Sequence, residues 1–322
     1  MGPDRAPADD ADAGRRFPAR SIEIVRSIEI VEAPRARAKL NLYLEIVGQR
    51  PDGYHELRTL FQTIDLRDDV LVDLGGEPGV RCVVVDADLP TDERNLAVRA
   101  AKEWLRATGR ADGIDLRIVK RIPIGGGLGG GSSDAAAVLQ SLQWLGGPAP
   151  VLSPDALLEL ARSLGADVPF LLEGGFAQGT GRGDVIAPLP PPPPVTYVLI
   201  LPPFGTETAK VYAQAHLRLR SAPRGGLERA KEAVASGVPA RIREAHHNDL
   251  AEAAMRAYPE MLRYTSLTER LLGRAPCMSG SGSTLFDVPD EGEVDDVVAR
   301  LASLPGRRVV VHPAGGPPSR PE

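Results

Sequence analysis

The residues best suited to chemistry form a glycine run before the middle of the chain. Residues 125–131 contain six glycines, and a serine pair follows them. Glycine lets backbone N–H groups come close to a ligand, and a helix that begins there adds free N–H groups and the positive end of its dipole. The pattern therefore predicts a polyphosphate site. Its expected residues are Pro123, Ile124, Gly125, Gly126, Gly127, Leu128, Gly129, Gly130, Gly131, Ser132 and Ser133.

Other nucleotide motifs fit this run less well. Gly125, Gly127 and Gly130 match the dinucleotide pattern G-x-G-x-x-G, but the region about 20 residues later offers only Asp155, at a helix start rather than a strand end. A P-loop needs Gly-Lys-Ser/Thr, and no lysine follows these glycines. The H-R-D and D-F-G segments of protein kinases are absent from the sequence. A linker is disfavoured because the run lies between a strand pattern and a helix pattern.

Two charged residues stand out as partners for phosphate chemistry. Lys39 lies in the alternating segment RAKLNLYLEI, and Asp167 follows the end of a predicted helix. Phosphoryl transfer needs charge stabilisation and a group that handles the proton of the attacking hydroxyl. Asn41 lies two residues after Lys39 and therefore shares its face of the strand. From the residues alone, a surface lysine, an edge-strand asparagine and a turn aspartate remain open readings.

The segment from Asp52 to His55 has the composition of a turn. Tyr54 offers a stacking face and His55 a hydrogen-bonding edge, which together suit a pyrimidine ring. His246 and His247 are adjacent in a predicted helix and would face apart, so we predict no metal site there.

Apolar periodicity places these residues on strands and helices. Residues 37–47 read as a strand, and strand-like segments continue after the turn at residues 49–55. Ser153, Pro154 and Gly165 carry start and stop signals of one helix. Predicted helices span residues 95–109, 132–145, 153–165, 207–216, 226–236 and 240–273, and predicted later strands span 196–201, 284–288 and 308–312. An α+β fold follows.

Composition limits the function classes. The net charge of −5 argues against a general nucleic-acid binder. The two cysteines lie far apart and read as reduced thiols. The sequence shows no secretory signal and no apolar stretch of about 20 residues, so we expect a cytoplasmic protein without membrane contact. Residues 1–30 have the composition of a disordered extension, and the proline run at 188–194 suggests a nearby domain boundary.

Several segments resemble one superfamily. The segment PIGGGLGGGSSDAA resembles the phosphate-binding motif of the galactokinase, homoserine kinase, mevalonate kinase and phosphomevalonate kinase (GHMP) superfamily, and SGSGSTLF at 279–286 resembles its third motif. The first-motif segment at 36–57, which joins K-L-N-L to D-G-Y-H, is similar to one branch of it. Members of that branch phosphorylate the 2-hydroxyl of 4-diphosphocytidyl-2-C-methyl-D-erythritol in the non-mevalonate route to isoprenoid precursors. NLAVRAA, GADVPF and HNDL fit the same branch, and the resemblance covers roughly residues 31–315.

The resemblance implies roles for individual residues. Lys39 and Asp167 would be catalytic. ATP, arriving with Mg²⁺ as co-substrate, would contact the glycine run together with Asn95 and Lys120. The cytidyl substrate would contact Asn41, Tyr54, His55, Thr208 and Tyr212. For Tyr212 a core role on its own helix stays open, as do a helix-start role for Asn95 and a solvated strand position for Lys120.

The resemblance also implies an architecture. We expect two domains, a ribosomal-S5-like ATP-binding and catalytic domain at 31–190 and a ferredoxin-like substrate domain at 195–316. No tightly bound cofactor is expected, and the expected state is a monomer or weak homodimer. Two alternatives remain: another member such as homoserine kinase, which should lack the K-L-N-L and D-G-Y-H pair, and an inactive nucleotide-binding module, which should have lost Lys39 or Asp167.

Overall fold

The structure is a computed structural model that describes residues 36–147, 151–215 and 225–316. All of them belong to one compact unit, Glu32–Glu322. The predicted disordered extension at 1–30 lies outside the described residues. Within the described part of the chain, no helix is long and apolar enough to cross a membrane.

The first sheet is built from the alternating segments that the sequence predicts, with an added hairpin. Its main path runs β3-β4-β2-β1-β8, and a hairpin of β5 and β6 joins at β2. β1 and β2 are antiparallel, whereas β3 and β4 are parallel. The strands are β1 (Ala36–Gln49), β2 (His55–Leu74), β3 (Gly79–Val85), β4 (Gly113–Val119), β5 (Phe176–Thr180), β6 (Val185–Leu189) and β8 (His247–Asn248).

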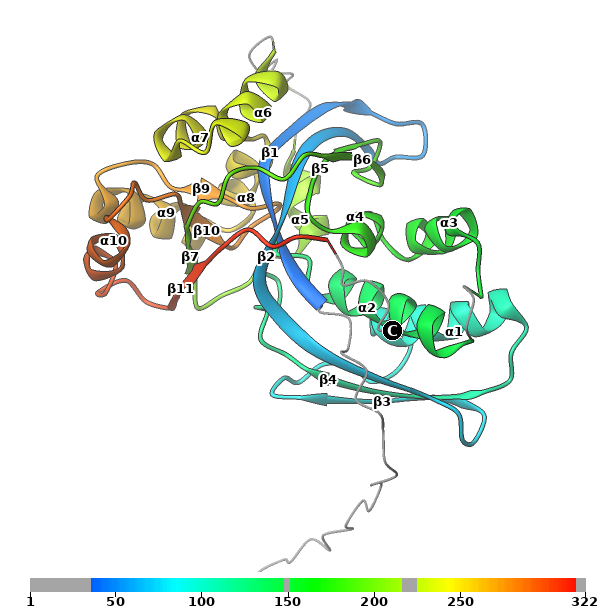
Figure 1. Cartoon of the computed structure of the whole chain (residues 1–322). Coiled ribbons are helices and arrows are strands. Elements are labelled where there is room, and N and C mark those ends of the chain that lie inside the picture. Colours follow the sequence, from blue (N-terminus) through cyan, green and yellow to red (C-terminus); the bar gives the residue numbers. More distant parts are fainter. Residues whose placement is uncertain (1–35, 148–150, 216–224, 317–322) are drawn as a thin grey trace, which may run out of the picture. The chain divides into compact units, whose positions relative to one another are not determined.

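Four helices pack against this sheet and share one apolar core with it (Figure 1). They are α1 (Leu96–Thr108), α2 (Gly130–Leu145), α3 (Pro154–Leu164) and α4 (Val168–Glu173). Asn95 caps α1 by accepting a hydrogen bond from Ala97 N, and Gly109 ends it with φ 68°. Ser153 caps α3 as predicted. The caps fix where α1 and α3 begin, and the chain between α3 and α4 carries Asp167.

The second sheet has the order β11-β7-β10-β9, and helices α5 to α10 lie around it (Figure 1). Its strands are β7 (Tyr197–Leu201), β9 (Cys277–Met278), β10 (Leu285–Asp287) and β11 (Arg307–Val311). The helices are α5 (Thr208–Gln214), α6 (Gly226–Ser236), α7 (Pro239–Ala245), α8 (Leu250–Ala257), α9 (Pro259–Leu272) and α10 (Val294–Arg300). β8 leaves this region to pair with β1 in the first sheet. The domain boundary near residues 190–195 stays a prediction.

The predicted single helix over 240–273 is wrong. The chain there forms α7, the short strand β8, α8 and α9. Tyr258 has extended backbone angles because it precedes Pro259, whose ring disfavours a helical residue before it. His246 is extended as well, which turns the chain into β8. The hairpin of β5 and β6, the short helix α4 and the two-residue strand β9 were not anticipated either.

His246 ties the two sheets together. Its Nδ1 lies 3.0 Å from the carbonyl oxygen of Leu42 in β1, and Met278 N in β9 donates to its Nε2 at 3.2 Å. Because Nε2 accepts, the ring proton must sit on Nδ1, and the imidazole is neutral. Burial lowers the pKa of His246 to about 4. A neutral imidazole is therefore part of the contact between the sheets.

We predict that this histidine makes stability depend on pH. The unfolded chain binds a proton at His246 below pH ~6.5, whereas the folded chain does so only near pH 4, so stability is lost as the pH falls between these values. The expected contribution is about 3 kcal/mol. Urea unfolding of the wild type and His246→Gln from pH 4.5 to 7.5 measures it. We expect a flatter curve for the variant, and parallel curves would contradict the assignment.

Candidate active site

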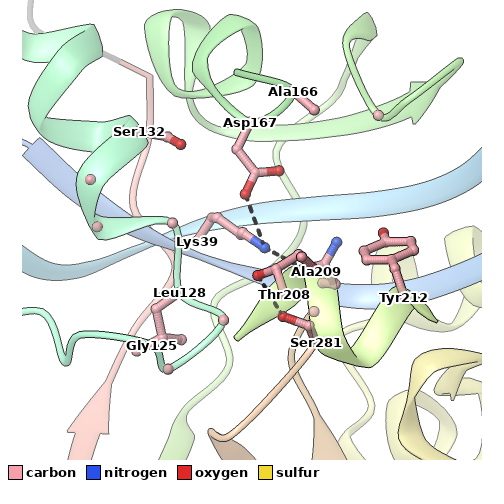
Figure 2. A pocket seen from close by; sticks show the side chains of 18 of the residues that line it. Lys39, Gly125, Leu128, Ser132, Ala166, Asp167, Thr208, Ala209, Tyr212 and Ser281 are labelled. Carbon is pink, nitrogen blue, oxygen red and sulfur yellow. Dashed lines mark hydrogen bonds and ion pairs between the residues drawn. The ribbon is translucent and has the colours of Figure 1, made fainter. Parts of the chain in front are cut away.

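One cleft brings together nearly all of the residues singled out in the sequence. Its volume is about 1190 Å³, and its walls come from β1, the glycine run, the start of α4 and α5. Figure 2 shows Lys39 and Asp167 on one side of Thr208 and Tyr212, with Gly125 and Leu128 of the glycine run nearby. Of the predicted site residues, only Ser133 is missing from the walls.

Lys39 is a buried cation in the wall of the cleft. Its Nζ donates to Asn41 Oδ1 at 2.6 Å and lies 3.5 Å from Asp167 Oδ2. The ammonium also lies 5.7 Å from the centre of the Phe61 ring. The lysine is only 4% exposed, so these groups replace most of its water. The alternation of β1 places Lys39 and Asn41 on one face, as predicted.

Glycines make room for this lysine from two directions. A Cβ on Gly129 would lie 3.1 Å from Lys39 Cγ. A Cβ on Gly280 would lie 3.3 Å from Lys39 Nζ, and Gly280 also has φ +55°. The glycine run and the segment SGSGSTLF at 279–286 therefore also leave space for the Lys39 side chain.

Asp167 presents a partly open carboxylate. It occupies the N-cap position of α4, yet its side chain makes no capping hydrogen bond within the described chain. The side chain is 32% exposed, compared with 5% for that of Lys39. Asp167 is thus held by the backbone at a helix start, while its oxygens face Lys39 and the cleft (Figure 2).

The glycine run turns its carbonyl groups into the protein. Gly125 O accepts from Thr206 N and Ser283 N, Gly126 O accepts from Thr284 N, and Leu128 O accepts from Lys39 N. In contrast, the N–H groups of Gly130, Gly131 and Ser132, in the first turn of α2, have no acceptor among the described residues. With the carbonyls occupied, these N–H groups at a helix start are free to donate hydrogen bonds to an anion.

Ser133 departs from the sequence expectation. Its hydroxyl donates to Arg37 O at 2.7 Å, and its N–H donates to Gly129 O. The side chain is buried, so the structure gives Ser133 a role in joining α2 to β1. Ser132, one residue earlier, lines the cleft.

Aromatic side chains define one end of the cleft. The rings of His55 and Tyr212 lie 5.2 Å apart, and Tyr54 is 57% exposed with the Arg182 guanidinium 5.2 Å from its ring centre. Asp52 shapes the turn by accepting a hydrogen bond from Tyr54 N. Burial lowers the pKa of His55. The end therefore offers exposed and half-buried rings around a neutral imidazole.

Two hydroxyl groups lie between this end and Lys39. Thr208 Oγ1 and Ser281 Oγ are 3.0 Å apart, and the Ser281 carbonyl accepts from Thr206 Oγ1. Ser281 and Arg182 were missed from the sequence. Their only signals were a serine within the third glycine-rich segment and an arginine in the turn TGRGD.

The other end of the cleft holds a buried charge cluster. Lys120 Nζ donates to Asp68 and, at 2.7 Å, to Asp134 Oδ2. The reading of Lys120 as a solvated strand lysine is therefore wrong. Burial raises the pKa of Asp134, and the charge of Lys120 opposes that rise. Asn95 also lines this end, where it caps α1.

Comparisons with known proteins give first the class and then the family. Residues 95–175 match the family model described as GHMP kinases N terminal domain. A 4-diphosphocytidyl-2-C-methyl-D-erythritol kinase of Gloeobacter violaceus is 40% identical over 285 residues, which cover 86% of this chain and 92% of that protein. One of Geobacillus thermodenitrificans is 40% identical over 255 residues, 78% of this chain and 86% of that protein.

A solved structure agrees with these relatives. A crystal structure of a 4-(cytidine 5'-diphospho)-2C-methyl-D-erythritol kinase superposes with a TM-score of 0.71 at 37% identity, covering 87% of this chain and 99% of that one. The chain therefore belongs to the 4-diphosphocytidyl-2-C-methyl-D-erythritol kinases, a family within the GHMP kinases.

The role of the glycine run can be tested at Gly131, beside which the structure leaves open space. No described heavy atom lies within 4 Å of a Cβ built on Gly131, whereas one on Gly127 would lie 2.4 Å from Ser279 O. We expect Gly131→Val to weaken ATP binding by about tenfold or more, because its methyl groups would stand before the free N–H groups. Its melting temperature should stay near that of the wild type.

Gly127→Ala provides the comparison. It should lower the melting temperature, because its backbone has φ +72° and the site has no room for a methyl group. Titration calorimetry and thermal unfolding measure both effects. Unchanged ATP affinity in Gly131→Val would remove the loop from the nucleotide site.

Proposed function

We propose that this protein transfers the γ-phosphate of ATP to the 2-hydroxyl of 4-diphosphocytidyl-2-C-methyl-D-erythritol, giving ADP and the 2-phosphate. The reaction is a step of the non-mevalonate route to isoprenoid precursors. The observation that carries the proposal is the pair of Lys39 and Asp167, which lies in one cleft between an anion-binding loop and an aromatic end.

The nucleotide would lie along the glycine run. The free N–H groups at the start of α2 would hold the phosphates, and the α2 dipole favours their negative charge. Asn95 and Lys120 would then lie at the adenine end. Lys120 is fixed there by Asp68 and Asp134, so a base would meet an ammonium group with little freedom to move.

The cytidyl substrate would enter from the aromatic end. Tyr54 and Tyr212 offer faces for a base, and His55 is neutral because burial lowers its pKa. A neutral imidazole has one donor and one acceptor, which suits the edge of a cytosine ring. Thr208 would contact the segment between the base and the acceptor hydroxyl, and Asn41 would contact the alcohol beside Lys39.

Asp167 and Lys39, at the centre of the cleft, would then take part in the transfer itself. Asp167 would accept the proton of the 2-hydroxyl, or orient that hydroxyl, as its oxygen attacks the γ-phosphorus. Lys39 would offset the charge that spreads over the phosphoryl oxygens and keep Asp167 ionised. Breaking the bond to the β-phosphate releases ADP.

ATP serves as co-substrate, and Mg²⁺ would enter with it. Magnesium ions in such sites are held largely by phosphates and water. The described residues contain no group of three or more His, Cys, Asp or Glu side chains arranged to hold a metal. A monomer or weak homodimer and a cytoplasmic location stay predictions.

A coupled ADP-release assay tests the proposal against its alternatives. We expect turnover with the cytidyl substrate and background rates with homoserine and mevalonate. The retained pair of Lys39 and Asp167 favours an active enzyme over an inactive nucleotide-binding module. Turnover of homoserine alone would favour homoserine kinase. No turnover with any of the three acceptors would favour the inactive nucleotide-binding module.

Tyr54→Ala tests the direction of the cleft within the same assay. Removing a stacking ring should raise the KM of the cytidyl substrate by a factor equivalent to about 1–3 kcal/mol and leave the KM of ATP unchanged. Tyr54→Phe, which keeps the ring, is the matched control. A rise in the KM of ATP instead would mean that ATP binds at the aromatic end and the cytidyl substrate along the glycine run.

A further inference from the structure

The last described residues of the chain return to the strand beside Lys39. We call residues 312–316 the C-terminal strap. Asp65 N donates to His312 O, and Ala314 N donates to Thr63 O at 2.8 Å, so the strap pairs with the middle of β2. Figure 1 shows this red segment leaving β11 and crossing β2. The sequence gives no chemical signal for this segment.

The strap is fastened to β1 as well. Arg37 Nη1 donates to the carbonyl oxygens of Gly315 at 2.5 Å and Gly316 at 2.9 Å. Arg37 lies two residues before Lys39 on β1. The strap therefore holds the strand just ahead of the catalytic lysine.

The third attachment is the end of α4, the helix that starts at Asp167. A Cβ on Gly174 would lie 3.1 Å from Gly316 Cα, and one on Gly316 would lie 2.7 Å from Glu173 O. The strap thus packs directly on the last turn of α4, at a distance that leaves little room for a Cβ on Gly174 or Gly316.

Thr63 joins all three attachments. It is the register partner of Lys39 across β1 and β2. Its hydroxyl donates to Ala314 O at 2.9 Å and accepts from Gly175 N at 2.8 Å, and its N–H donates to Gly175 O at 2.9 Å. The residue is 2% exposed, so water cannot readily replace these partners. Thr63 therefore links β1, which carries Lys39, with the strap and with the end of α4, the helix that starts at Asp167.

We propose that the C-terminal strap is a positioning segment for the reaction, which sets the placement of Asp167 relative to Lys39 by holding α4 against β1 and β2. The inference rests on the proposed function. Misplacing a reacting group by about 1 Å can slow a reaction by about 100-fold. Loss of the strap should therefore act on the chemical step more than on binding.

Two shortened chains form a matched pair for the test. A chain ended after Pro313 lacks Ala314, Gly315 and Gly316, whereas a chain ended after Gly316 keeps the whole strap. For the chain ended after Pro313 we expect kcat to fall by about 10–100-fold, with dissociation constants for ATP and the cytidyl substrate changed less than about threefold. The chain ended after Gly316 should match the full chain.

Hydrogen exchange provides a readout that does not need turnover. Leu171 N and Gly174 N donate within and at the end of α4, to Asp167 O and Phe170 O. Both amides should exchange faster in the chain ended after Pro313, while amides of α1 should not change. If the full chain shows no transfer to the cytidyl substrate, the proposed function fails, and the exchange rates of the α4 amides still test the positioning role of the strap.

A point variant covers the case in which the chain ended after Pro313 does not fold. Thr63→Val keeps the shape but removes the hydroxyl, and Thr63→Ser keeps the hydroxyl. We expect the kcat loss and faster α4 exchange in Thr63→Val, with recovery in Thr63→Ser. A lower melting temperature with unchanged kcat and α4 exchange, in Thr63→Val or in the chain ended after Pro313, would overturn the proposal.

Discussion

The arrangement of the active site depends on one buried ammonium group. Removing Lys39 from water costs several kcal/mol unless partners replace its hydration. Asn41 supplies a short hydrogen bond, Asp167 an opposite charge at 3.5 Å, and Phe61 an aromatic face. These partners come from β1, the start of α4 and β2, so the elements must meet where the charge is buried. The same geometry leaves the Asp167 carboxylate facing the cleft, where an acceptor hydroxyl would arrive.

The glycine run and the segment at 279–286 serve both this constraint and the proposed phosphate site. Gly129 and Gly280 leave space around Lys39, while the carbonyls of the loop bond to the protein and leave N–H groups free at the start of α2. The segment at 279–286 packs against this loop, because Ser279 Oγ donates to Gly127 O at 3.3 Å and a Cβ on Gly127 would lie 2.4 Å from Ser279 O. A side chain at Gly127, Gly129 or Gly280 would disturb the lysine or the loop. The pattern of glycines therefore reflects the close packing of the glycine run and residues 279–286 around Lys39, in addition to the proposed phosphate site.

The sequence predicted what depends on local pattern. The period of β1 placed Lys39 beside Asn41, and capping signals located the ends of α1 and α3. It missed what depends on distant partners. The burial of Lys120 follows from Asp68, 52 residues away, and the contact of Ala314 with Thr63 spans 251 residues. The break near His246 was missed for the same reason, because its ring bonds to Leu42 and Met278 rather than to its own helix.

The central claim is that Lys39 and Asp167 act as one unit in phosphoryl transfer. Single-turnover rates of the wild type, Lys39→Met, Asp167→Asn and the double variant test it most directly, with dissociation constants measured separately. We expect Asp167→Asn to slow transfer by about 10²–10⁴-fold while binding changes much less. The double variant should lose less than the product of the single losses, because each residue depends on the other. Near-wild-type transfer in Asp167→Asn, or strictly multiplicative losses, would contradict the account.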